Sequence, residues 1–116
     1  MIQAVGTALS AINAFARKFG VSANNIANLN TDGFKKSRVI MTEENPADVM
    51  ATINRVESPG APIPSSDGSP EMRESSNVLV EEEMIALTVA KHGYNANLKV
   101  MKAQDDLLGS LFDTQG

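Results

Sequence analysis

Apolar residues recur in steps of three and four from the beginning of the chain to Ile26, without a missed position. This spacing, sustained over more than three heptads, is typical of a helix that packs along a partner helix. It predicts a helix over about residues 3–28, roughly 40 Å long at 1.5 Å per residue. Such a one-sided helix is not stable alone. The apolar positions are Ile2, Val5, Leu9, Ile12, Ala16, Phe19, Ala23 and Ile26.

A second apolar stripe with the same spacing occupies the end of the chain and predicts a helix over about residues 78–112, roughly 50 Å long. The preceding Ser75, Ser76 and Asn77 offer N-cap oxygens, and Glu81–Glu83 place negative charge near the positive end of the helix dipole. Lys91 and Asp105 interrupt the stripe. Its apolar members are Val80, Met84, Leu87, Tyr94, Leu98, Met101, Leu108 and Phe112.

The two stripes predict that the helices pair, with Leu9 or Ile12 on one facing Leu98 or Met101 on the other. A parallel row of apolar residues widens the face of the second helix, so one partner helix does not cover it. We therefore expect the isolated chain to associate with further copies of itself. This second row consists of Leu79, Ala86, Ala90, Val100, Leu107 and Leu111.

The segment between the stripes contains all five prolines of the chain, within residues 46–70, together with glycine and serine. This composition predicts turns and extended chain, with short strands at residues 39–41 and 49–56. The predicted fold class is therefore mainly α: two long terminal helices packed as a coiled-coil-like pair, joined by a Pro/Gly/Ser-rich linker with at most a small β-hairpin. The expected division of the chain is 1–32, 33–76 and 77–116, with the first and last parts forming a polymerising core.

The composition argues against an enzyme. The chain of 116 residues has no Cys and a single His92, so it offers no thiolate, disulfide or histidine cluster. Glu81–Glu83 lie where acids stabilise a helix start, and the adjacent Asp105 and Asp106 point to different faces of a helix. We expect no catalytic, cofactor-binding or metal-binding residue, and no cofactor.

The net charge of −4 is unevenly distributed. Residues 1–42 carry five cations against one acid, and the remainder carries five cations against thirteen acids. Opposite ends of the chain, or of neighbouring copies, can therefore attract each other, although solvated faces without a partner account for the charge equally well. The net acidity and the 4% aromatic content disfavour nucleic-acid binding. Direct membrane insertion is not expected, because no apolar run approaches ~18 residues; residues 2–19 also carry few cations for a helix lying on a membrane surface.

Four asparagines gather where the first predicted helix ends: Asn24, Asn25, Asn28 and Asn30. Asparagine amides both donate and accept hydrogen bonds, so they can bond backbone carbonyls or partner side chains; alternatively they only weaken the helix end. Asp32 and Gly33 tolerate the backbone conformations that stop a helix.

The stretch SANNIANLNTDGFKKSRV resembles the N-terminal signature of the bacterial flagellar rod and hook proteins. The later stretch SNVLVEEEMIALTVAKHGYNANLKV resembles the family's C-terminal helix, apart from a missing Asp after Ser-Asn-Val. In size the chain is most similar to the short, proximal-rod type. The matching residues are Ala23, Asn24, Asn25, Ile26, Ala27, Asn28, Asn30, Thr31, Gly33, Phe34 and Lys35 in the first stretch, and Tyr94, Ala96, Asn97, Lys99 and Val100 in the second.

The resemblance implies a structural subunit of the flagellar basal-body rod that self-assembles through its paired terminal helices and contributes to motility. Its implied partners are other copies of itself, other flagellar axial proteins and the flagellar type III export apparatus. The implied location is the periplasmic rod, reached without a cleaved signal peptide. A small helical adaptor that binds rod or export components without being polymerised is the alternative.

Overall fold

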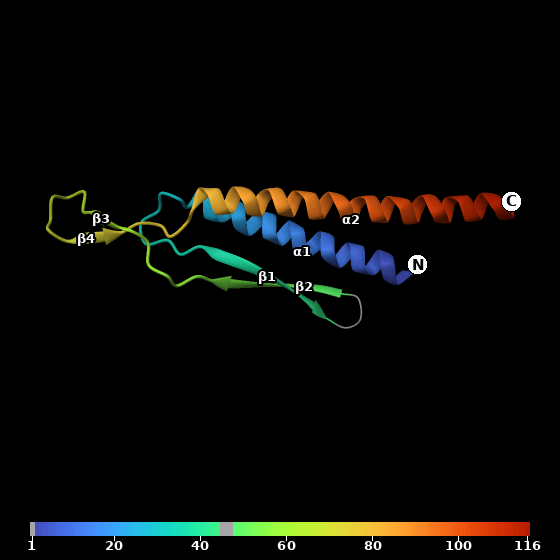
Figure 1. The fold of residues 1–116 in the computed structure, drawn as a ribbon, viewed down its shortest axis with the longest axis horizontal. Helices are drawn as coiled ribbons and strands as arrows, with labels where there is room; N and C mark the ends of the chain where they lie inside the picture. Colours follow the sequence, from blue (N-terminus) through green and yellow to red (C-terminus); the bar gives the residue numbers. More distant parts are fainter. Residues whose placement is uncertain (1, 45–47) are drawn as a thin grey trace.

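The computed structural model describes residues 2–44 and 48–116 (Figure 1), apart from the side chain of Ile2. The molecule is elongated, with extents of 79 × 24 × 16 Å. Two long helices and four strands make up the described part of the chain. They are α1 (Ile2–Ala27), β1 (Ser37–Glu44), β2 (Asp48–Arg55), β3 (Pro62–Pro64), β4 (Met72–Glu74) and α2 (Val80–Gln115).

The helices α1 and α2 run antiparallel and pack side by side (Figure 1). Their bounds lie within about three residues of the predicted ones, because apolar spacing and the turn residues around Gly33 determine them. The prediction of a mainly helical fold with two long terminal helices is confirmed. Coiled-coil-like packing of the pair stays a prediction. The last turns of α2 extend past the first residue of α1 (Figure 1).

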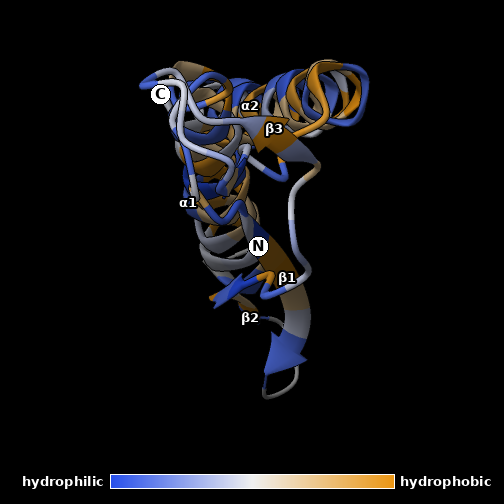
Figure 2. Ribbon diagram, turned by 90° about the vertical axis from the view of Figure 1, so that its left-hand side faces the viewer, coloured by the Kyte–Doolittle hydropathy of each residue, from blue (hydrophilic) through white to orange (hydrophobic). Residues whose placement is uncertain are grey.

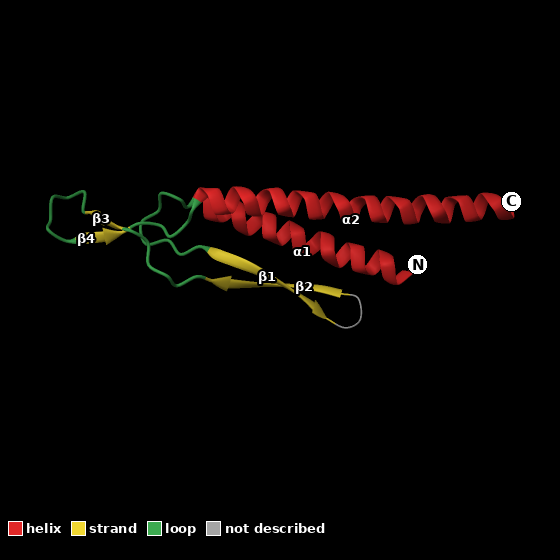
Figure 3. Ribbon diagram, viewed as in Figure 1, coloured by secondary structure: helices red, strands yellow, loops and turns green. Residues whose placement is uncertain are grey.

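The strands β1 and β2 form an antiparallel hairpin that packs on α1, so that α1 lies between α2 and the hairpin (Figure 3). In β1, every second residue from Ser37 to Met41 is half-buried and the alternate residues are exposed. The Ser10 hydroxyl accepts a hydrogen bond from the Val49 N–H (3.1 Å), which ties β2 to α1. This hairpin was predicted from its branched and apolar residues.

A second antiparallel pair, β3 and β4, forms an arm at the end of the molecule opposite the C-terminus (Figure 1). The prediction of at most one small hairpin was therefore wrong. The two strands are only three residues long and β3 contains two prolines, so no alternating pattern marks them. Contacts from outside the strands stabilise the arm: the Ser75 N–H donates to the Ala61 carbonyl (2.9 Å) and the Gly33 N–H donates to the Glu74 carbonyl (2.7 Å).

Most of the buried apolar residues are alanines. The buried apolar residues, in the part of the chain that the structure describes, are Ala8, Ala11, Ile12, Ala14, Val78 and Ala90. On α1 the buried line runs one residue earlier than the predicted stripe, through Ala8, Ala11 and Ser22 to Asn25. Small side chains let α1 approach two neighbours closely, and the larger Leu9 and Phe19 are left about half exposed. Hydrophobic and hydrophilic residues are accordingly interleaved along both helices (Figure 2).

Candidate functional site

The asparagine-rich end of α1 meets the start of α2 and of β1, and we call this region the junction: residues 25–37 together with 56–60 and 74–83. Asn25 lies at its centre and is 1% exposed. Its Oδ1 accepts a hydrogen bond from the Ser37 N–H (3.0 Å), and its Nδ2 donates to the Ser37 carbonyl (2.8 Å) and to Glu83 Oε1 (3.0 Å). One amide therefore joins α1, β1 and α2, a combination of donors and acceptor that neither a carboxylate nor an apolar side chain provides.

The other three asparagines have different surroundings. Asn28 closes the helix end locally: its Nδ2 donates to the Asn24 carbonyl (2.9 Å) and its Oδ1 accepts from the Thr31 hydroxyl (3.2 Å). The side chains of Asn24 and Asn30 are exposed. The sequence left open whether the asparagines form bonds or only weaken the helix end, and the structure assigns long-range bonds to Asn25 alone among the four.

Gly33 lies in the turn that follows α1 and has a positive φ of 68°, a conformation that glycine adopts at little cost. Its N–H reaches the Glu74 carbonyl of β4, so the turn after α1 is bonded to the β3–β4 arm. Asp32 forms an ion pair with Arg73 beside it. The sequence identified Gly33 as a signal that stops the helix. No local sequence pattern predicts its hydrogen bond to Glu74, a residue 41 positions away.

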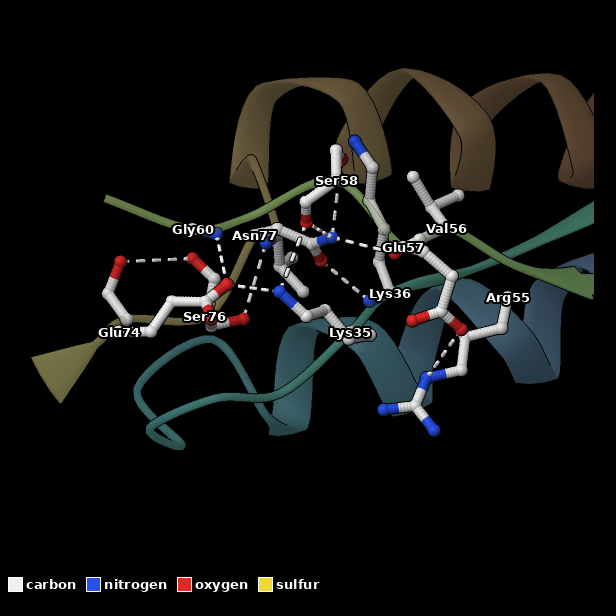
Figure 4. Close-up of polar contacts among 12 residues, drawn as sticks. Lys35, Lys36, Arg55, Val56, Glu57, Ser58, Gly60, Glu74, Ser76 and Asn77 are labelled. Carbon is white, nitrogen blue, oxygen red and sulfur yellow. Dashed lines mark hydrogen bonds and ion pairs between the residues drawn. The ribbon is translucent and has the colours of Figure 1, made fainter. Parts of the chain in front are cut away.

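The two lysines after this turn pair with two different acids. Lys36 is buried, and its Nζ donates to Glu82 Oε2 in the first turn of α2 (2.5 Å). Lys35 forms an ion pair with Glu74, whose Oε1 also accepts the Gly60 N–H (2.6 Å), as Figure 4 shows. Two of the five cations in the first part of the chain are therefore matched at close range by acids from the second part.

Asn77 does not have the predicted role of an N-cap. The N-cap position of α2 is Leu79, which forms no side-chain capping bond. Instead Asn77 Oδ1 accepts the Lys36 N–H (2.6 Å), and its Nδ2 donates to the carbonyls of Val56 (2.9 Å) and Ser58 (2.8 Å) (Figure 4). A side chain that bonds three backbone groups of two separate segments holds these segments together at the start of α2.

The three acids at the start of α2 also differ from one another. All three lie in the first turn, where the helix dipole favours negative charge. Glu81 is exposed, Glu82 pairs with Lys36, and Glu83 is buried with only 6% exposed, bonded to Asn25. The sequence predicted an interaction with the helix dipole for all three. Only the tertiary structure shows that Glu83 bonds a residue of α1 and that Glu82 pairs with the lysine directly before β1.

Acid is expected to destabilise the junction. The hydrogen bond and charge of Lys36 lower the pKa of Glu82 below its ordinary value of 4.5, and the hydrogen bond of Lys35 lowers that of Glu74. Because the folded-state pKa is the lower one, the stabilisation is complete above about pH 4.5 and is lost as the pH falls through the folded-state pKa. Glu82→Gln should decrease stability at neutral pH and make the decline below pH 4.5 shallower.

Urea unfolding measured across this pH range tests the expectation. Glu81→Gln is the matched control, since Glu81 lies in the same helical turn and is exposed. Equal effects of the two substitutions at all pH values would show that only the helix dipole matters.

The predicted helix-pairing residues occupy three kinds of position. Ile12 is buried, and Val5, Ile26, Leu87 and Met101 are half-buried. Ile2 begins α1, but its side chain lies outside the described residues. The others are between about one third and three quarters exposed, so their part in helix pairing or in contacts with further copies stays a prediction. They are Leu9, Phe19, Val80, Met84, Tyr94, Leu98, Leu108 and Phe112.

Several stripe residues lie beside the contact between the helices. Phe19 and Tyr94 line one groove between α1 and α2. Val5, Met101 and Leu108 line a second hollow further along the same pair of helices. The sequence analysis missed Phe15, whose ring lies directly over Gly93, and we expect this contact to determine the register of the pair. An interior helix glycine is the signal that marks such a close approach.

The remaining motif residues do not form a common site. Ala23, Ala27 and Thr31 are exposed, and Phe34 is half-buried. In the second motif, Asn97 Nδ2 donates to the Gly93 carbonyl one turn earlier (2.8 Å). Within residues 2–44 and 48–116, no group of three or more metal-binding side chains comes together. Neither of the two described helices is apolar enough over a sufficient length to cross a membrane.

Comparison with known protein families gives two matches. Residues 6–35, which contain most of α1 and the turn after it, match the family described as "Flagella basal body rod protein". Residues 70–114, which contain β4 and nearly all of α2, match "Flagellar basal body rod FlgEFG protein C-terminal". A search of curated proteins finds no match.

The two matched segments contain most of the junction and both helices of the antiparallel pair. These are the features by which the chain is classed as a structural protein. The chain belongs to the flagellar basal-body rod protein family. Membership indicates a structural role in the rod, location in the flagellar basal body, and association with other rod and axial proteins.

Proposed function

We propose that the chain is a structural subunit of the flagellar rod that assembles with copies of itself and with other axial proteins through α1 and α2. One observation carries the proposal: α2 exposes large apolar side chains from its first turn to its last, and α1 exposes Leu9 and Phe19, although the two helices are already packed against each other. Exposed apolar surface of this extent in an elongated molecule is typical of a protein–protein interface. The family match supplies the flagellar context.

The proposal assigns different roles to different parts of the chain. Residues 1–32 and 77–116 form the polymerising core, and residues 33–76 form a connecting segment that the junction attaches to both helices. The subunit is exported by the flagellar type III apparatus without a cleaved signal peptide and joins the rod in the periplasm. Its assembly into the rod contributes to motility.

Purified hook–basal bodies provide the test. We expect the chain to be present in them in several copies, and cells lacking it to build no complete rod and to be non-motile. Recovery of the chain with rod or export components, combined with its absence from purified basal bodies, would contradict the proposal and support the non-polymerised adaptor instead.

A further inference from the structure

An apolar groove of about 290 Å³ lies between α1 and α2. It opens on a different side of α1 from the hollow that Ser10, Ala14 and Arg17 line together with the β1–β2 hairpin. We call it the aromatic groove, because it contains three of the five aromatic residues of the chain. Its lining residues are Phe15, Ala16, Phe19, Ala90, Lys91 and Tyr94.

A fourth aromatic residue has no such surroundings. Phe112, in the last turns of α2, is 76% exposed, more than any other large hydrophobic residue in the described part of the chain. It lies near the C-terminal end of α2, which ends at Gln115, and the last turns of this helix extend past α1 (Figure 1). Phe112 and Tyr94 belong to one continuous helix and are separated by roughly 27 Å along it, at 1.5 Å per residue. Phe112 therefore cannot fill the groove of its own chain.

We propose that Phe112 of one copy inserts into the aromatic groove of a second copy. Aromatic side chains prefer offset or edge-to-face contact with other aromatic rings, which Phe15, Phe19 and Tyr94 offer. Charge is complementary as well: Lys91 is the one charged residue lining the groove, and Asp113 follows Phe112 directly. A second copy supplies both features at once.

The contact joins two different patches of the same chain, so it is heterologous and can repeat from one copy to the next. Repetition of this kind produces a filament when the rotation does not close a ring. The proposal rests on the proposed function in that it specifies one contact between rod subunits. Unlike rod membership, it is tested on the purified chain without any flagellar component.

Sedimentation of the purified chain over an about hundredfold concentration range is the first experiment. The wild-type chain should self-associate, and Phe112→Ala should weaken this association about tenfold or more, because the aromatic side chain is central to the contact. Ile85→Ala is the matched control, since Ile85 is also on α2 and 65% exposed but lies outside the groove. A wild-type chain that stays monomeric, or equal weakening by both substitutions, would overturn the proposal.

Mixing two variants tests which patches meet. Phe112→Ala retains the groove but lacks the inserted ring, whereas Ala16→Glu places a charge in the groove and retains Phe112. Ala16 is exposed in α1 and glutamate is a good helix former, so the second variant keeps its fold. At concentrations where the wild-type chain associates and each variant alone is monomeric, the two variants together should form a 1:1 complex. A mixture that remains monomeric at concentrations where the wild-type chain associates would contradict the assignment.

A charge exchange provides an independent readout. Lys91→Glu should weaken self-association, and Lys91→Glu combined with Asp113→Lys should restore it, with helicity unchanged in both. Failure of the second substitution to restore association would remove Asp113 as the partner of Lys91 and overturn the proposed geometry. Failure of any of these experiments leaves the basal-body test of rod membership unaffected.

Discussion

Asn25→Asp is expected to destabilise the chain by about 3–5 kcal/mol at neutral pH, the range found when a buried polar pair is broken and a charge is left uncompensated. The substitution preserves shape but removes both donors of Nδ2, which bond the Ser37 carbonyl and Glu83. It also places a second carboxylate beside Glu83, which is itself buried. Urea unfolding followed by circular dichroism would measure the change as a shift in midpoint at constant m-value.

The neighbouring Asn24 provides the matched control. Asn24→Asp makes the same chemical change one residue earlier in α1, at an exposed side chain, and should change stability by less than about 0.5 kcal/mol. Asn25→Ala, which removes the bonds without adding charge, should fall between the two. Because protonation of the introduced carboxyl relieves the repulsion, the deficit of Asn25→Asp should shrink in acid. Equal effects at positions 24 and 25 would contradict the junction described above.

Gly93→Ala is expected to destabilise the chain by about 2 kcal/mol, although alanine is the better helix former by ~1 kcal/mol. A Cβ on Gly93 would lie 2.3 Å from Cζ of Phe15, far inside van der Waals contact. Since the ring is held between the two helices, it or the helices must move. Thermal or urea unfolding measures the loss.

Gly109→Ala in the same helix is the control for this prediction. No atom lies within 4 Å of the position that its Cβ would take, so the substitution should stabilise the chain by up to ~1 kcal/mol. Combining Phe15→Leu with Gly93→Ala should recover part of the loss, because a smaller side chain leaves room for the methyl group. Stabilisation by Gly93→Ala equal to that by Gly109→Ala would show that Phe15 does not determine the register of the helices.

Local signals account for the elements that the sequence predicted. The spacing of apolar residues produces two long helices because side chains three and four positions apart share a helix face. Gly33 lies in the turn after α1 because its positive φ suits glycine, and the branched residues around Ile40 and Ile53 form the β1–β2 hairpin. The family motifs could also be recognised in the sequence, and the two family matches include them.

Long-range contacts decided the rest. Which residues of each helix face the partner depends on how closely the helices approach each other. Near the contact of Phe15 with Gly93, small residues are buried and larger apolar residues remain partly exposed. The roles of Asn25 and Asn77 depend on backbone groups that lie 12 and 41 residues away in the sequence. No local pattern encodes such partners, because a polar side chain bonds whichever unsatisfied group the fold brings to it. The sequence by itself therefore determined the helices, the hairpin and the family, whereas the tertiary structure decided which surface is buried in the chain and which remains free for other copies.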